Sequence, residues 1–159
     1  MSRFLFPICA AAAAAAALAL SACASDPARP GPGKRDADKR ALYEAHAGAP
    51  VDKFRFFGEI NGWTSLGDAA IAVWTKPSEA WLLDLSGPCQ GIDYAFAIGL
   101  TSQFGQVSRG FDKVLVHDRS QVDIPCRIAK IRPLDVKAIE QAERSAREAQ
   151  KAPAQPSGT

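Results

Sequence analysis

The sequence has little excess charge of either sign. Its 19 lysines and arginines are almost balanced by 17 aspartates and glutamates, so the formal net charge is only +2. A dedicated binder of nucleic acid or of an anionic surface carries a pronounced basic excess. The balance argues against both classes, and no nucleic-acid partner is expected.

Motifs that hold cofactors or metals are also absent. The sequence contains no phosphate loop and no dinucleotide-binding fingerprint. A hydrolase nucleophile elbow requires Gly-x-Ser-x-Gly, but the glycines on either side of Ser102 have the wrong spacing. There is no Cys-x-x-Cys pair, and the two histidines, His46 and His117, are far apart in the chain. We therefore expect no metal and no cofactor.

Acidic residues supply the main catalytic alternative. Two carboxylates at a suitable separation can hydrolyse glycosides, but the sequence places no two of them together. Acidic residues at strand ends are mostly solvated turn groups. His117 is a further candidate proton carrier, although a single exposed histidine is usually an ordinary surface residue. The candidate acids of a small hydrolase are Glu59, Asp68, Asp84, Asp93, Asp112 and Asp123.

The first 22 residues have the layout of an export signal. Arg3 provides a positive charge, residues 4–20 are uncharged and mostly alanine and leucine, and small residues follow. The segment Leu20-Ser21-Ala22-Cys23 resembles the lipobox of bacterial lipoproteins. This resemblance implies that the Cys23 thiol receives diacylglycerol and becomes the N-terminus once residues 1–22 are removed. Three acyl chains, at ~0.8 kcal/mol per buried CH₂, would make a lasting membrane anchor.

Two other interpretations of this segment stay open. They are a plain secretory signal cleaved near Ala24 and an uncleaved transmembrane helix, which needs about 20 apolar residues. The weak hydrophobicity of alanine and the presence of Pro7 argue against a span, and neither alternative accounts for Cys23. By the same resemblance, Ala24-Ser25 lacks the aspartate that retains lipoproteins at the inner membrane. We therefore expect the protein at the outer membrane, facing the periplasm.

The composition divides the remaining chain into a tether, one domain and a tail. The predicted segments are a flexible tether rich in Pro and Gly at 23–35, a single periplasmic domain at 36–150 that begins and ends with a helix (36–46 and 134–150), and a disordered tail at 151–159. Asp36 or Asp38 is the expected N-cap of the first helix.

Between the two helices the apolar residues recur with a period of two, which is typical of strands. The expected strands are residues 54–60, 70–75, 80–85, 98–101, 111–117 and 122–131. We therefore predict a mainly β (α+β) domain: a small antiparallel sheet, barrel or sandwich, with a short N-terminal helix and a C-terminal helix.

The clearest unit is a hairpin over residues 70–85. Pairing of Thr75 with Ala80 predicts that Trp74 lies opposite Trp81. Both faces of this hairpin are apolar over most of their length. We therefore expect one face on the core and the other covered by a helix or by a partner.

The cysteines predict one disulfide. Cys9 leaves with the signal and Cys23 is consumed by lipid, so Cys89 and Cys126 remain as a pair in an oxidising compartment. Strand alternation turns Cys126 inward, toward Cys89. Pro125 removes a hydrogen-bond donor from the ladder, so we expect an edge strand or a bulge there.

Trp63, Trp74 and Trp81 are candidate binding residues, because aromatic rings stack on sugars, peptides or lipid chains when they line a groove. The simpler interpretation is that such rings fill the core, and we favour it for Trp74 and Trp81. Trp63 is the exception, because the preceding Asn61-Gly62 predicts a loop.

One further pattern runs through most of the chain, from about Ala41 to Ala138. Its segments are residues 47–51, 54–58, Trp63, 73–75, 87–89, 98–102, 125–128 and 131–134. This pattern resembles a family of small, uncharacterised proteobacterial lipoproteins of unknown function. The resemblance implies export, the cysteine pair and a single domain, and it offers no catalytic residue.

Together these observations favour a non-catalytic binding or interaction module of the cell envelope. We expect lipid to hold it at the outer membrane, with an envelope protein as its partner. The alternatives are a small envelope hydrolase and a carrier of a small apolar ligand. A carrier would need a cavity of about a few hundred Å³ between sheet and helix.

Overall fold

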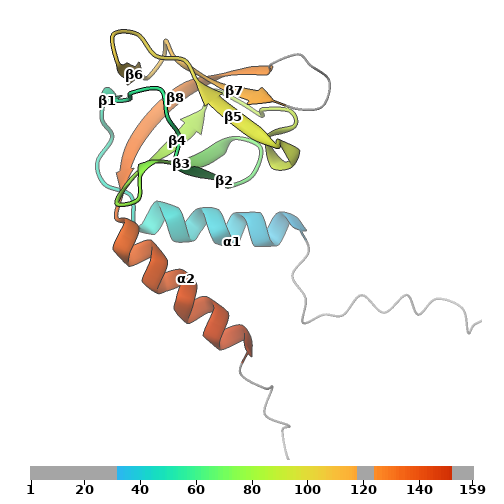
Figure 1. The fold of residues 1–159 in the computed structure, drawn as a ribbon. Helices are drawn as coiled ribbons and strands as arrows, with labels where there is room; N and C mark the ends of the chain where they lie inside the picture. The colour runs from blue at the N-terminus through green and yellow to red at the C-terminus, as the bar shows by residue number, and fades with distance from the viewer. Residues whose placement is uncertain (1–31, 118–123, 152–159) are drawn as a thin grey trace, which may run out of the picture. The chain divides into compact units, whose positions relative to one another are not determined.

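The computed structural model describes residues 32–117 and 124–151, so the predicted signal, Cys23, Asp123 and residues 152–159 of the predicted tail at 151–159 lie outside the described residues, whereas Lys151 still belongs to a helix. Within these ranges the chain forms two α-helices, a 3₁₀ helix and eight strands (Figure 1). In chain order they are α1 (Pro32–Ala45), β1 (Lys53–Arg55), β2 (Gly62–Ser65), β3 (Ala70–Lys76), β4 (Glu79–Leu85), η1 (Ile92–Tyr94), β5 (Ala97–Leu100), β6 (Gln106–Ser108), β7 (Lys113–His117), β8 (Ile124–Leu134) and α2 (Val136–Lys151).

The strands form a nearly closed antiparallel barrel. Six of them are hydrogen-bonded in the order β2-β3-β4-β8-β7-β5, and β1 and β6 make a separate two-stranded ribbon. Strand β8 is shared, because its first half pairs with β7 and its second half with β4. The expected mainly β domain with flanking helices is confirmed, and the barrel decides between the two architectures that the sequence left open.

Apolar side chains fill the inside of the barrel. Alternation along the strands turns every second residue inward, as in β7, where Val114 and Val116 are fully buried. Phe54 of β1 stacks on Trp81 of β4 with ring centroids 4.7 Å apart, which joins the ribbon to the larger sheet. Other buried members are Phe56, Ile71, Val73, Leu83, Leu85, Cys89, Ile92, Ile98, Val107, Ile128 and Ile131.

A second apolar cluster lies on the outer face of β3 and β4. The strands contribute mostly small side chains there, which lets helices approach the sheet closely. Helix α1 covers this face with Leu42 and Tyr43, and α2 covers it with Val136 and Ile139. The second apolar face of the hairpin is therefore covered by the chain's own helices, and no partner is needed to bury it.

The register of the β3–β4 hairpin differs from the sequence prediction. At the turn the pairing is as expected, but further along Trp74 pairs with Ala80 instead of Trp81. The reason is a β-bulge at Thr75, which adds one residue to β3. Because side chains alternate, this one-residue shift sends Trp74 and Trp81 to opposite faces of the sheet.

Helix α1 begins four residues earlier than predicted, inside the segment assigned to the tether. Pro32 stands at its first position, where a fixed φ suits the helix and a missing N–H leaves no bond unmade. Asp36 and Asp38 therefore lie within the helix, and the prediction that one of them is its N-cap was wrong.

Helix α2 begins two residues later than predicted, because Leu134 still belongs to β8. Asp135 caps it, with a carboxylate oxygen that accepts a hydrogen bond from the backbone N of Ala138 at 3.0 Å. Neither α1 nor α2, nor η1 between them, is long and apolar enough to span a membrane.

The strand predictions need three corrections. The predicted strand 54–60 pairs only over Lys53–Arg55, and the short strands β2 and β6 were not predicted. The bulge in β8 lies at Ala129, opposite the step from Asp84 to Leu85, and not at Pro125. At Pro125 strand β8 pairs with β7 alone, so the missing donor faces no second strand, and the edge position expected as the alternative to a bulge is confirmed there.

Candidate functional site

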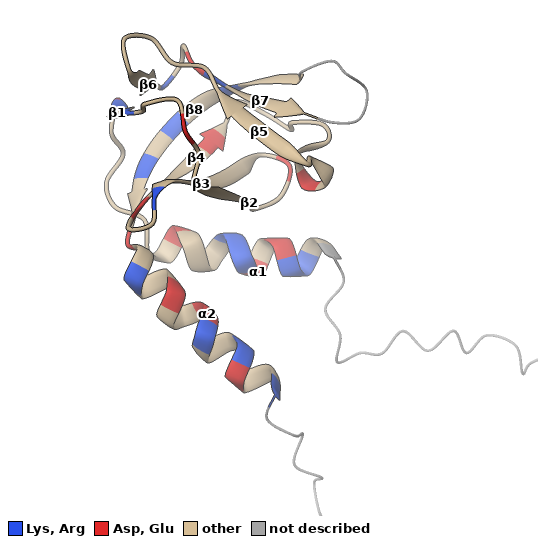
Figure 2. Cartoon of the chain, viewed as in Figure 1, with Lys and Arg blue, Asp and Glu red and all other residues tan. Residues whose placement is uncertain are grey.

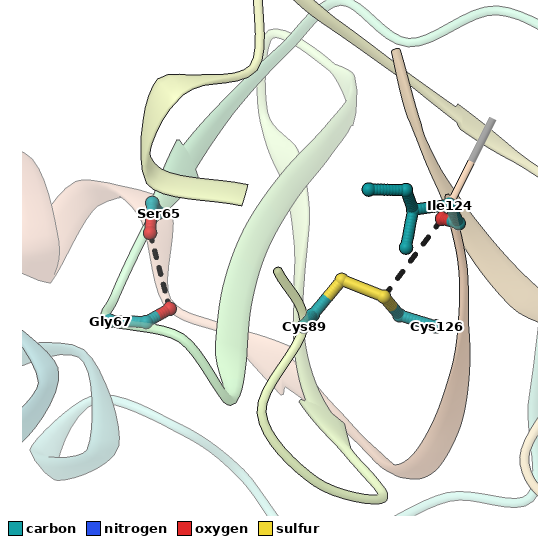
Figure 3. The surroundings of a disulfide bond; sticks show 5 residues. All are labelled: Ser65, Gly67, Cys89, Ile124 and Cys126. Carbon is teal, nitrogen blue, oxygen red and sulfur yellow. Dashed lines mark hydrogen bonds between the residues drawn. A yellow bond between two sulfur atoms is a disulfide. The ribbon is translucent and has the colours of Figure 1, made fainter. Parts of the chain in front are cut away.

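The cysteine pair links β8 to the loop that follows β4 (Figure 3). Cys89 and Cys126 are joined by a disulfide, with Cα atoms 5.8 Å apart. Cys89 is buried, and its backbone N donates to the carbonyl oxygen of Asp68 at 2.7 Å. Cys126 is partly buried against the same apolar core, so the bridge belongs to the framework of the barrel and offers no thiol for chemistry.

The three tryptophans do not form one surface. Trp81 lies in the barrel core on Phe54, whereas Trp74 lies on the outer face, with its ring edge-to-face against Tyr43 at 6.2 Å. Trp63 belongs to β2, where it pairs with Val73 and packs against the barrel core, so the loop predicted for it was wrong. The three rings therefore line no common groove.

Two of the predicted acids, Asp112 and Asp93, accept hydrogen bonds from neighbouring groups of the fold. Asp112 is only 3% exposed, and its carboxylate accepts bonds from the Thr101 hydroxyl at 2.8 Å and the Ser108 backbone N at 2.7 Å. This arrangement satisfies a buried acid at the turn between β6 and β7. Asp93, in η1, accepts a hydrogen bond from the Ser65 hydroxyl of β2.

The remaining predicted polar candidates are exposed or lie on strands. Glu59, Asp68 and Ser102 are exposed in loops, and His117 ends β7 opposite Ala97. Within residues 32–117 and 124–151, no group of three or more His, Cys, Asp or Glu side chains is placed to hold a metal ion.

Asp84 belongs to a charged cluster where α1 meets the barrel. It accepts hydrogen bonds from Arg40 at 3.2 Å and from Arg132 at 3.1 Å. Glu44 pairs with Arg40 at 2.9 Å and with Arg132 at 3.5 Å. Figure 2 shows charges of both signs on α1 and basic segments on β8. A cavity of about 510 Å³ opens here, lined by these four side chains and by Lys130, Ala69, Leu85 and Ala129.

The chemistry of this cavity is that of ion pairs. Hydrogen bonding from Arg40 lowers the pKa of Glu44, against an opposing effect of burial. A general acid for glycoside hydrolysis needs a raised pKa, so Glu44 does not suit that role. Asp84 is also held between two arginines. The charged lining does not suit a small apolar ligand either.

A different surface lies on the β1–β6 ribbon, at the end of the barrel away from both helices (Figure 1). Phe54 and Phe56 point into the core, so the alternate residues Lys53, Arg55 and Phe57 point outward and are exposed. We call Lys53 and Arg55 the basic row. Neither has an ion-pair partner in the part of the chain that the structure describes. Figure 2 shows basic residues at β1.

Phe104 lies beside the end of this row. The backbone N of Phe56 donates to the carbonyl oxygen of Gly105 at 2.9 Å, so Phe57 and Phe104 each directly adjoin a residue of this bonded pair. Phe57 is 77% exposed and Phe104 is 99% exposed. We call these two side chains the aromatic tip.

The backbone at the tip is unusual for the residue that occupies it. Phe104 and Gly105 are the two central residues of a hairpin turn closed by Gln103 and Gln106, and both have positive φ, 53° and 69°. Such turns favour Asn or Gly at the first position, and a bulky residue there is strained. The sequence signal was weak, because Gly105 alone marked this turn.

Comparison with known proteins places the chain in a family without assigning an activity. No curated protein and no solved structure matches it. A family of unknown function, DUF6491, matches residues 6–150, and the chain therefore belongs to this family.

Proposed function

We propose that the chain is an exported lipoprotein, acylated at Cys23 and held at the periplasmic face of the outer membrane. The barrel acts there as a non-catalytic binding module. Support for the anchor comes from the sequence: Arg3, the uncharged residues 4–20 and the lipobox-like segment that ends at Cys23.

The observation that carries the binding role is the exposed aromatic tip. Phe104 gains no core contact in return for its strained backbone, because its side chain is 99% exposed. Its left-handed backbone and its exposed ring both raise the free energy of the folded chain, and the ring has no contact in the core that offsets this. We therefore ascribe the residue to a contact with another molecule. The apolar face of β3 and β4 cannot serve this purpose, because α1 and α2 cover it.

The two alternatives receive less support from the charged cavity. Its acids, Asp84 and Glu44, converge between β4 and α1, but each is paired with arginine. These ion pairs fasten α1 to the barrel, which gives the two acids a structural role. A carrier of an apolar ligand would need an apolar lining, whereas Arg40, Lys130 and Arg132 line this cavity.

Metabolic labelling with radioactive palmitate tests the anchor. The wild-type chain and a Cys9→Ala control should both be labelled, since Cys9 lies in the removed segment, whereas Cys23→Ala should not be. In density-gradient separation, the wild type should fractionate with the outer membrane and Ala24→Asp with the inner membrane. Label that survives Cys23→Ala, or a wild type without label, would contradict the proposal.

A further inference from the structure

Phe57 of the aromatic tip and the basic row share one exposed face, and Phe104 lies in the turn beside it. Lys53, Arg55 and Phe57 alternate with the buried Phe54 and Phe56, so they form a single outward row. Residues two apart on a strand are separated by about 6.8 Å. The row therefore runs from a phenyl ring at the end of the ribbon, past a guanidinium, to an ammonium about two such steps away.

Acidic side chains do not cancel this row. Asp52, which precedes it, is paired with Arg109 at 2.6 Å. Asp112 is buried and bonded to Thr101 and Ser108. Glu59 is the exposed acid that follows Phe57 by two residues, and it lies beyond the strand. The net charge of the whole chain is only +2, but this face carries the two positive charges of Lys53 and Arg55.

The shape of the tip distinguishes between classes of partner. Phe104 is the first central residue of a two-residue turn and is 99% exposed, so it protrudes and lines no groove. Binding to folded proteins is usually dominated by side chains in closely packed, desolvated pockets. Exposed aromatic rings at the tip, with Arg55 one step and Lys53 two steps behind Phe57, suit a lipid interface, where the rings enter the acyl boundary and the cations meet headgroups.

We infer that the aromatic tip and the basic row dock on a phospholipid surface that carries anionic headgroups. Amphipathic membrane-binding surfaces bury their apolar face about 5–10 Å into the headgroup and acyl boundary, and this depth is close to the one-step distance between Phe57 and Arg55. The ring and the guanidinium can therefore occupy the apolar and charged layers at the same time. The tip supplies orientation on the membrane and does not need to supply the whole affinity.

This inference deepens the proposed function and rests on it, because the lipid on Cys23 brings the barrel to the membrane. Pro32 follows Cys23 by nine residues, a covalent reach of up to ~30 Å. This reach is comparable with the diameter of a small domain. A face of the barrel away from α1 can therefore reach the same bilayer.

Fluorescence quenching on vesicles tests the docking. The full chain, purified from membranes, carries either Phe104→Trp or the matched control Tyr94→Trp. Tyr94 is 92% exposed and comes before the start of β5, whereas Phe104 comes after its end. Vesicles contain phosphatidylcholine brominated on its acyl chains, alone or with an equal part of phosphatidylglycerol. Background from the native tryptophans is measured with the parent chain and subtracted.

The added fluorescence of Phe104→Trp should be quenched on the anionic vesicles, while that of Tyr94→Trp should not. Adding Lys53→Gln and Arg55→Gln should lower the equilibrium constant for contact between the tip and the vesicle surface about 30-fold, since each cation near the surface contributes about 1 kcal/mol. Both side chains are exposed, so the fold should not depend on them. Equal quenching at the two positions, or none at position 104, overturns the docking and favours a protein partner for the tip.

Mass measurement of the N-terminal peptide from the same sample separates this inference from the proposed anchor. Lipid on Cys23 without quenching at position 104 overturns the docking alone. Quenching at position 104 with an unmodified Cys23 supports the docking and overturns the anchor.

Discussion

Asp84 of β4 and Arg132 of β8 form an ion pair of 3.1 Å at the point where α1 meets the barrel. Both side chains are largely buried, at 13% and 17% exposed. Arg40 of α1 joins Asp84 from the other side at 3.2 Å, so one carboxylate connects the helix to two strands. Asp84 therefore holds α1, the first element after the predicted tether, on the barrel.

Replacing this carboxylate should loosen α1. Asp84→Asn leaves Arg132 poorly compensated in a largely buried site, and the free energy of unfolding should fall by about 1–3 kcal/mol. Urea denaturation measures the change. Glu140→Gln serves as the control, because its pair with Arg144 is 3.8 Å long and exposed, and such pairs contribute less than about 1 kcal/mol. Equal effects of the two substitutions would show that the cluster does not hold the helix.

The turn at Phe104 should become more stable when its side chain suits the backbone. Phe104→Asn creates an Asn-Gly pair with Gly105, which favours positive φ at both positions. The free energy of unfolding should rise by about 1 kcal/mol, the cost of a left-handed bulky residue. Tyr94→Asn, equally exposed but not left-handed, should change little. A loss of stability in Phe104→Asn would mean that the ring stabilises the fold, against the argument made for the tip.

The disulfide should account for a large part of the stability of the barrel. It closes a loop with a sequence separation of 37, so Cys126→Ser should lower the free energy of unfolding by about 2–4 kcal/mol. Denaturation with and without reductant checks this value. Reductant should destabilise the wild type and leave Cys126→Ser unchanged. If the wild type did not respond to reductant, the two cysteines would not be paired in solution.

Acid should weaken the α1 contact through Glu44. Hydrogen bonding from Arg40 lowers the pKa of Glu44 below its ordinary value of 4.5. A lowered pKa in the folded state stabilises the fold above the unfolded value, and this contribution disappears as the pH falls through the folded value. Stability measured from pH 7 downward should therefore decline less below about pH 4.5 in Glu44→Gln than in the wild type. Parallel curves for the two chains would contradict this assignment.

The periodicity of the sequence predicted the fold better than its register. Alternating apolar residues indicated the β domain and the two apolar faces of the β3–β4 hairpin. The extra residue at Thr75 was not predictable, because a bulge depends on how the whole sheet twists and packs. Without the bulge, alternation places Trp74 and Trp81 on the same face of the hairpin, whereas in the structure they lie on opposite faces.

The candidate site was harder to predict because it depends on contacts between distant segments. Arg40, Asp84 and Arg132 are far apart in the sequence and meet only when α1 lies on the barrel. Phe104 could not be recognised as exposed, since an aromatic residue near strands is usually part of the core. Its positive φ is a property of the folded turn, and only Gly105 marked it beforehand.

The mass of the N-terminal peptide of the mature protein tests the central claim most directly. Attachment of lipid at Cys23 predicts a peptide that begins at this residue and carries the mass of diacylglycerol and a further acyl chain. A peptide that begins near Ala24 without lipid, or one that retains residues 1–22, would contradict the claim.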